Sequence, residues 1–145
     1  EPFENGIAAL LPRVAEDGLE NIRLHHGDAR DLLDVLPAGG LGRCYLLYPD
    51  PWPKKKHHRR RFVQQDTLDQ LARALRSGAE VRLATDIPDY ARHSLEQFHR
   101  HPAFTWLAEA PGDWRRPWAG WQSTRYEAKA LREGRPPCSP RFRRV

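Results

Sequence analysis

A rigid turn between residues 48 and 61 constrains the fold of this chain more than any other stretch. It reads Tyr-Pro-Asp-Pro-Trp-Pro-Lys-Lys-Lys-His-His-Arg-Arg-Arg and follows a short apolar run, Cys44 to Leu47. That run is typical of a buried parallel strand, although four residues alone do not exclude a helix. Each proline pushes the residue before it out of the helical region, so we expect Asp50 and Trp52 in an extended turn. Asp50 should then be displayed beyond a strand's carboxyl end, where open α/β sheets bind ligands.

A basic run follows the turn directly. Six of the eight residues from Lys54 to Arg61 are Lys or Arg, and removing these six charges from the net charge of +5 leaves −1 for the rest. This concentration of positive charge predicts an acidic partner, with nucleic acid as the first candidate. A basic run by itself is more often a solvated surface or a localisation signal, so it is not specific without the turn.

Length and composition fit one globular domain. The chain has 145 residues, of which 39% are hydrophobic, enough for a single core. No apolar run approaches the roughly 20 residues that span a bilayer, and no signal-peptide pattern opens the chain. We therefore expect a cytoplasmic protein without a membrane partner. Cys44 and Cys138 form no Cys-x-x-Cys pair and are interpreted as ordinary thiols. The sequence does not indicate an oligomeric state.

Strand and helix signals alternate along the chain, which predicts a parallel α/β sheet. Pro12 predicts a kink in the first helix or its division into two short pieces, and Gly18 is a plausible stop. The predicted helices cover residues 2–15, 31–36 and 68–75, the last ended by Ser77-Gly78, and the predicted strands cover residues 21–25, 44–47, 80–84, 104–107 and 141–145.

A further helix is predicted to start at Thr85-Asp86. Asp86 is suited to cap its free amides, and Pro88 suits its first turn. Ala91, Leu95 and Phe98 fall at helical spacing and are expected to form its buried face.

Two sequence blocks together resemble one family, the bacterial tRNA (guanine-N7)-methyltransferases. The Pro-Asp-Pro-Trp turn running into a Lys/His/Arg cluster is the family's hallmark. Thr124-Arg125-Tyr126-Glu127, followed by Lys129 and Gly134, resembles its Thr-x-Tyr/Phe-Glu segment, with Ala84-Thr85-Asp86 between the blocks. The resemblance runs from Glu1 to Val145. It implies a single methyltransferase domain over residues 1–145 that transfers a methyl group from S-adenosylmethionine to N7 of a guanine in tRNA.

The resemblance also implies the α/β fold of class I S-adenosylmethionine-dependent methyltransferases, a Rossmann-like sheet. Such a fold opens with a strand and a Gly-rich turn, because glycine lets the backbone approach the ligand closely. This chain contains no such turn and begins at Glu1, which resembles the acid at the end of the family's second strand. We therefore expect the first strand and the Gly-rich turn to be missing from this chain.

The resemblance assigns the cofactor-binding residues. Glu1 is implied as the ribose ligand, Asp28 beside Ala29 as the adenine-side ligand, and Asp50 as a residue next to the cofactor. The alternatives are a frayed terminal acid for Glu1 and a turn former for Asp28, because Gly-Asp pairs are common in turns.

Asp50 matches the family's catalytic position. The N7 lone pair of guanine carries no proton, so methyl transfer needs no general base and the main task is positioning. A carboxylate can accept hydrogen bonds from guanine N1–H and the 2-amino group, and it can stabilise the positive charge that moves onto the purine. The alternative role for Asp50 is to fix the turn.

Further residues are assigned to the substrate by the same resemblance. Asp86 is either a substrate contact or the helix cap already described. The block from Thr124 to Glu127 is either a substrate site or a helix start, because Thr-x-x-Glu is also a capping box. Trp52 either stacks on a base or packs in the core. The implied substrate contacts are Lys54, Asp86, Thr124, Arg125, Tyr126 and Glu127, and the implied phosphate contacts are Lys55, Lys56, Arg59, Arg60 and Arg61.

No metal is expected. His57 and His58 are adjacent and flanked by cations, and they lack the carboxylate or thiolate companions of a closed metal site. Two hypotheses stay open at this point. The first is a tRNA methyltransferase, and the second is a truncated relative that binds RNA without catalysis.

Overall fold

The computed structural model describes all 145 residues, which divide into two compact units, residues 1–36 and residues 37–145. No helix in either unit combines the length and apolar character needed to cross a membrane. The single domain over residues 1–145 stays a prediction.

The first unit contains two helices, α1 (Glu4–Glu16) and α2 (Ala29–Val35). Pro12 lies inside one continuous α1, so the predicted division of this helix is wrong. Pro12 and Ala8 are both exposed, so the Ala8 carbonyl that loses its helical partner can bind water instead. Gly18 ends the helix as predicted, with φ of +60°, which glycine adopts without steric cost.

The strand predicted over residues 21–25 does not form, because a strand needs a hydrogen-bonded neighbour and residues 1–36 contain none. The backbone nitrogen of Glu1 donates to the carbonyl of His25 at 3.2 Å, so this stretch bonds to the start of the unit instead. The helix predicted over residues 31–36 is confirmed. It begins earlier, at Ala29, because the Asp28 carboxylate accepts from the amide of Arg30 at 2.9 Å and caps it.

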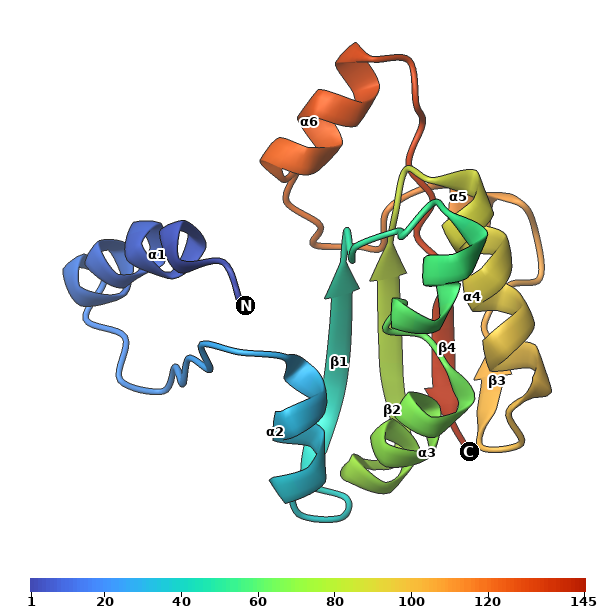
Figure 1. Cartoon of the computed structure of the whole chain (residues 1–145), viewed down its shortest axis with the longest axis horizontal. Coiled ribbons are helices and arrows are strands. Elements are labelled where there is room, and N and C mark those ends of the chain that lie inside the picture. The colour runs from blue at the N-terminus through green and yellow to red at the C-terminus, as the bar shows by residue number, and fades with distance from the viewer. The chain divides into compact units, whose positions relative to one another are not determined.

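The second unit is built on a four-stranded sheet in the order β1-β2-β4-β3 (Figure 1). Its strands are β1 (Leu41–Leu47), β2 (Leu75–Ala84), β3 (Phe104–Trp106) and β4 (Arg141–Arg144). β1 and β2 are parallel, as predicted, but β4 is antiparallel to both of its neighbours. The sheet is therefore mixed, which corrects the prediction of a parallel sheet.

A backbone bridge explains the direction of β4. The amide of Thr85 donates to the carbonyl of Cys138 at 3.1 Å, and the amide of Cys138 donates back at 2.9 Å. The chain therefore returns beside the carboxyl end of β2 and enters the sheet from that edge. A strand that starts there can only run against β2.

Two strands differ in detail from their predictions. β1 begins at Leu41 and is half-exposed, with Tyr45 47% and Leu47 43% exposed, whereas a buried strand was predicted. Ser77-Gly78 lies inside β2 and does not end a helix. Gly78 has φ of +79°, and the register with β1 shifts at this point, so the pair forms a bulge.

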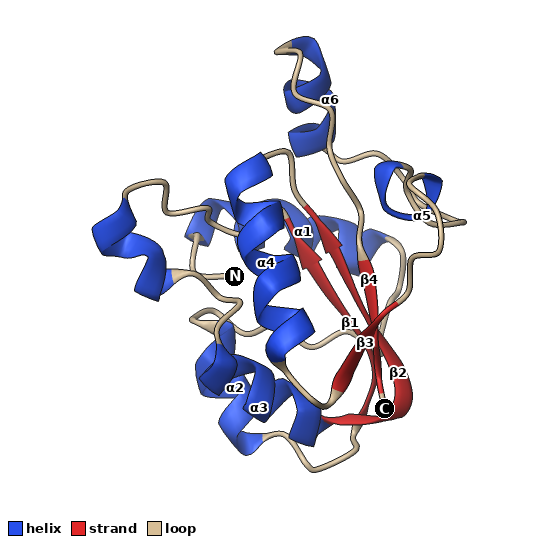
Figure 2. Ribbon diagram, turned by 90° about the vertical axis from the view of Figure 1, so that its right-hand side faces the viewer, coloured by secondary structure: helices blue, strands red, loops and turns tan.

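Helices α3 (Gln65–Ala74) and α4 (Pro88–Arg100) cover one face of the sheet (Figures 1 and 2). Phe98 of α4 stacks on Phe142 with ring centroids 3.8 Å apart, so it belongs to the buried face as predicted. Ala91 and Leu95 are only half-buried. The core side of α4 is carried by Tyr90, Ser94 and Phe98.

Three shorter helices complete this unit: the 3₁₀ helix η1 (Lys55–Arg60), α5 (Gly112–Arg115) and α6 (Arg125–Arg132). α6 lies beyond the carboxyl ends of β1 and β2 in both views (Figures 1 and 2). The strands predicted near residues 104–107 and 141–145 are confirmed as β3 and β4.

Candidate functional site

Two of the predicted site residues leave the sheet at the same edge. Leu47 at the end of β1 pairs with Ala84 at the end of β2, and the amide of Tyr48 donates to the Ala84 carbonyl at 2.8 Å. Asp50 and Asp86 follow these two strand ends. The Asp50 side chain is exposed, as predicted, so its carboxylate is available to a ligand at the carboxyl edge.

Tyr48 connects this edge to α6. Its ring stacks on Tyr126 with centroids 5.8 Å apart and an interplanar angle of 19°. Burial, and after it the nearby carboxylates of Glu127 and Asp86, raise the pKa of Tyr48 to about 12. The second block of the resemblance is thus brought to the sheet edge that displays Asp50.

Asp86 is held by an ion pair and does not cap α4. Arg135 Nε donates to Asp86 Oδ2 at 2.8 Å, and the Asp86 side chain is 13% exposed. The amide of Ile87 is satisfied by the Thr85 hydroxyl at 3.2 Å. The predicted capping role of Asp86 is therefore wrong, because its carboxylate turns toward Arg135. Pro88 does occupy the first turn of α4.

The block at residues 124–127 is a helix start and also a buried acid. The Thr124 hydroxyl accepts from the amide of Glu127 at 3.1 Å and caps α6. Glu127 itself is 8% exposed, and its Oε2 accepts from the indole of Trp121 at 2.8 Å. Arg125 lies over the ring of Tyr126 at 5.3 Å.

Trp121 was missed as a partner of Glu127. The only signal was its place in a segment rich in tryptophan, where its ring packs edge-on against Trp118 at 4.9 Å. Sequence spacing does not predict that an indole six positions away would turn back onto a helix. The capping-box prediction is therefore confirmed for Thr124 alone.

The turn itself departs from the extended geometry that was predicted. Tyr48 has φ of +51° and Trp52 has φ of +43°. Both precede a proline and avoid the right-handed helical region, but they do so at positive φ, which is costly for bulky side chains. Such conformations cost of order 1–3 kcal/mol each and persist only where the surroundings fix them.

The basic run contains exposed cations and one buried cation. Trp52 is half-buried and packs edge-on against His57 at 5.9 Å, and Arg60 lies over its ring at 5.0 Å. Arg61 is only 1% exposed, which does not fit the phosphate contact predicted for it. The exposed members of the run are Lys54, Lys55, Lys56, Arg59 and Arg60.

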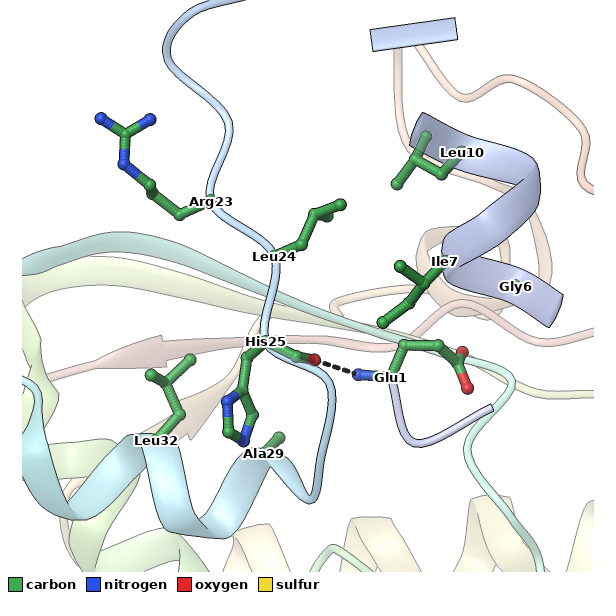
Figure 3. Close-up of a pocket in the computed structure, with 9 residues that line it drawn as sticks. All are labelled: Glu1, Gly6, Ile7, Leu10, Arg23, Leu24, His25, Ala29 and Leu32. Atoms are coloured by element: carbon green, nitrogen blue, oxygen red, sulfur yellow. Dashed lines mark hydrogen bonds between the residues drawn. The ribbon is translucent and has the colours of Figure 1, made fainter. Parts of the chain in front are cut away.

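Residues 1–36 form a pocket of their own with a volume of about 380 Å³ (Figure 3). Glu1 and Ala29, both predicted to bind the cofactor, line it together. Its other walls are mainly apolar, from Ile7, Leu10, Leu24 and Leu32, with Gly6, Arg23 and His25 completing the lining. Apolar walls with a few polar groups are the usual composition of a small-molecule pocket.

Asp28 does not line this pocket. Its carboxylate binds the Arg30 guanidinium at 2.8 Å in addition to capping α2. The hydrogen bond from the Arg30 amide lowers the pKa of Asp28. Glu1 is also held locally, because its Oε1 accepts from the amide of Phe3 at 2.8 Å.

Potential metal-ligating side chains do not cluster, and both cysteines are free thiols. No group of three or more His, Cys, Asp or Glu side chains is close enough to hold a metal ion. Cys44 and Cys138 are both free, and burial raises the pKa of each thiol to about 11. Both thiols are therefore protonated at neutral pH.

A family described as "Putative methyltransferase" matches residues 1–139. The chain belongs to this family. A tRNA (guanine-N(7)-)-methyltransferase from Ruegeria sp. (strain TM1040) is 60% identical over 144 residues, which are 99% of this chain and 56% of that protein. A protein of the same name from Ruegeria pomeroyi is 59% identical over 145 residues, 100% of this chain and 61% of that protein. The chain thus spans less than two thirds of the curated relatives it matches.

Solved methyltransferases share the fold of this family member. An rRNA methylase from Streptococcus thermophilus superposes with a TM-score of 0.62 at 13% identity, covering 100% of this chain and 70% of that one. A methyltransferase homologue from Pyrococcus horikoshii gives 0.64 at 12% identity, covering 99% and 52%. The predicted α/β fold of class I methyltransferases is confirmed.

Proposed function

We propose that the protein carrying this chain transfers a methyl group from S-adenosylmethionine to N7 of a guanine in tRNA. One structural observation supports this most: β1 and β2 end side by side, with Asp50 exposed beyond the end of β1 and Asp86 beyond the end of β2. The names of the relatives at about 60% identity point to the same reaction. Methyltransferase activity, tRNA binding, a cytoplasmic location and the absence of a metal are all proposed for the whole protein.

Asp50 is proposed to position the purine. Guanine N7 is already nucleophilic, so the carboxylate accepts from N1–H and the 2-amino group and aims the opposite edge of the base at the methyl group. As the methyl group arrives, positive charge develops on the purine, and a fixed carboxylate stabilises it. No proton has to be removed from the nucleophile in this reaction.

Residues around Asp50 are proposed to hold the rest of the nucleoside. Asp86 uses Oδ2 for Arg135, which leaves Oδ1 to accept from the substrate. Glu127 likewise uses Oε2 for Trp121 and keeps Oε1. Thr124, Arg125 and Tyr126 lie on the same first turn of α6 or cap it. Buried acceptors with one fixed partner are pre-oriented, which reduces the entropy lost on binding.

The exposed cations of the turn are proposed to bind tRNA. Lys54 is the proposed substrate contact next to Asp50, and Lys55, Lys56, Arg59 and Arg60 are the proposed phosphate contacts. Their positive charges lie on η1 or immediately before it, so one short helix presents them together. Phosphate contacts of this kind position the RNA without reading its sequence.

The pocket of residues 1–36 is proposed to hold the adenosine part of the cofactor. Glu1 supplies a carboxylate acceptor for ribose hydroxyls, and Ala29 with the apolar walls suits the adenine ring. Asp28 does not line the pocket, so its role as ligand of the adenine amine, like that of Asp50 as a cofactor-binding residue, stays a prediction from the resemblance. S-adenosylmethionine supplies the methyl group as an electrophilic sulfonium.

The test uses the whole natural protein that carries this sequence. It is incubated with S-adenosylmethionine and unmodified tRNA, and the nucleosides are analysed by mass spectrometry. We expect N7-methylguanosine as the product. Retention of tRNA without any methylated nucleoside would contradict the proposal and leave the binding-only hypothesis.

Calorimetry separates the contribution of this chain from that of the whole protein. We expect S-adenosylmethionine to bind the whole protein and not the isolated 145-residue chain, because this chain contains no Gly-rich turn. Tight binding by the isolated chain would show that the pocket of residues 1–36 is sufficient for the cofactor.

A further inference from the structure

Arg61 is the one cation of the basic run that does not face solvent. Its side chain is 1% exposed, whereas its neighbours Arg59 and Arg60 are exposed. A buried guanidinium is costly unless its donors are paired. The partners of Arg61 therefore indicate what its burial accomplishes.

The first partner belongs to the proline turn. Arg61 Nε donates to the carbonyl of Pro51 at 2.9 Å. This carbonyl belongs to the peptide that joins Pro51 to Trp52, and it lies directly after Asp50. Trp52 has φ of +43°, a conformation that needs support from its surroundings. The bond from Arg61 fixes the peptide on the N-terminal side of that residue.

The second partner belongs to α4. Arg61 Nη2 donates to Asp89 Oδ2, and the guanidinium lies over the ring of Tyr90 at 5.5 Å. Asp89 also accepts from Arg92 at 3.0 Å. Because α4 packs on the sheet through Phe98 and Phe142, this ion pair connects the turn to a helix that is anchored in the core.

Further bonds fix the chain on both sides of Arg61. The amide of Arg61 and the side chain of Gln64 both donate to the carbonyl of His58, at 3.0 Å and 2.7 Å. Arg61 Nη2 also lies 3.0 Å from His58 Nε2. The C-terminal end of η1 is thereby held in place at the same point as the turn.

We propose that Arg61 is a positioning residue, which bridges the Pro51 carbonyl and Asp89 and so holds Asp50 and the basic helix η1 in their working geometry. The proposal rests on the proposed function for the role of Asp50. Arg61 itself contacts neither the substrate nor the cofactor. Only a guanidinium can serve both partners, because its donors point in fixed directions from one planar group.

The structural part of this proposal is tested by native-state proteolysis with trypsin. Arg61→Met and Arg59→Met each remove one cleavage site from the run, so they are a matched pair. Arg61→Met should speed cleavage within residues 54–60 by about tenfold or more, because the run opens locally once its anchor is lost. The Arg59→Met variant should be cleaved at the wild-type rate, since this substitution removes no bond to the turn.

The functional part is tested by separating kcat from KM for tRNA in the whole protein. Arg61→Met should lower kcat by about 100-fold, the cost of a misplaced reacting group, and should also raise KM for tRNA, because the phosphate contacts on η1 open with the run. Arg59→Met should raise KM alone and leave kcat close to wild type. Arg61→Lys, which keeps the charge on Asp89 but cannot also bind Pro51 in the same way, should recover only part of the kcat.

A double-mutant cycle shows whether Arg61 acts through Asp50. The double variant Asp50→Asn/Arg61→Met should methylate tRNA no more slowly than Asp50→Asn alone. Displacing the turn has no further effect on the rate once the Asp50 carboxylate is gone. Multiplicative losses would overturn the proposal, as would wild-type proteolysis of Arg61→Met or full recovery by Arg61→Lys. If the wild-type protein makes no N7-methylguanosine, the proposed function fails, while the proteolysis comparison still decides whether Arg61 anchors the turn.

Discussion

The acidic residues of the two units are held in different ways. In residues 37–145, Asp86 binds Arg135, which lies 49 positions away, and Asp89 binds Arg61, which lies 28 positions away. In residues 1–36, Glu1 and Asp28 bind amides only two positions away. The first kind of contact exists only when the whole unit is folded, whereas the second is formed by any local turn.

Burial follows the same division. Leu33 is the one buried residue in residues 1–36, while residues 37–145 contain the aromatic stack and the buried strand β2. Regions with few buried apolar contacts open at lower free energy than core strands. The comparison therefore predicts that the proposed substrate edge opens less readily than the pocket of residues 1–36.

The largest effect is expected from matched truncations in the two units. Phe98→Ala should lower the free energy of unfolding of residues 37–145 by about 3–5 kcal/mol, because it removes a ring that is fully buried against Phe142. Leu11→Ala on α1, where the side chain is 51% exposed, should change the free energy of unfolding of residues 1–36 by less than about 0.5 kcal/mol. Urea denaturation followed by circular dichroism measures both, and equal losses would remove the contrast in rigidity.

A second pair of variants compares charge in the two units. Arg59→Glu on η1 should weaken tRNA binding by roughly fivefold to tenfold and flatten its dependence on salt, because a phosphate contact and its released counterion are lost. Arg13→Glu on α1 makes the same change in net charge and should leave both nearly unaltered. Filter binding over a range of salt concentrations measures the two slopes, and identical slopes would show that net charge alone attracts the RNA.

The sequence predicted what depends on neighbours along the chain. It predicted the strand that ends before Asp50, the exposure of Asp50, the cap by Thr124 and the stop at Gly18. Each of these follows from residues within a few positions, such as a proline that blocks a helix or a hydroxyl that meets a nearby amide.

The predictions that failed depend on segments far apart. From its neighbours along the chain Asp86 is predicted to cap a helix, but in the fold its carboxylate pairs with Arg135. Arg61 is predicted to contact phosphate, but in the fold its guanidinium is buried and pairs with Asp89. The antiparallel direction of β4 likewise depends on the Thr85–Cys138 bridge. A spacing pattern contains no information on such pairs, because the fold and not the local chain decides which side chains meet.

The acid limit of stability gives a smaller and more specific test. Hydrogen bonds from Arg61 and then Arg92 lower the pKa of Asp89 below 3.8. A carboxyl with a lowered folded pKa stabilises the fold above its unfolded pKa, and this contribution is lost as the pH falls through the folded pKa. Asp89→Asn should therefore have a lower melting temperature than wild type at pH 6. The difference between the two melting temperatures should shrink as the pH falls below 3.8. A constant difference down to acid pH would contradict the ionic role of Asp89.

The smallest effect concerns the two thiols. Because burial raises the pKa of Cys44 and Cys138 to about 11, both should react slowly with a disulfide reagent at pH 8 in the native state and rapidly after unfolding. Absorbance of the released thiolate follows the reaction. Fast labelling of the native protein would show that β1 and the segment near Cys138 open more readily than the packing of this unit indicates.

The most direct test of the proposed site is the substitution Asp50→Asn in the whole natural protein, because it keeps the size of the side chain and removes its charge. N7-methylguanosine formation should fall by about 100-fold to 1000-fold, as for loss of one preorganised electrostatic contact, with tRNA affinity nearly unchanged. Methylation at the wild-type rate by Asp50→Asn would contradict the account and remove Asp50 from the reaction.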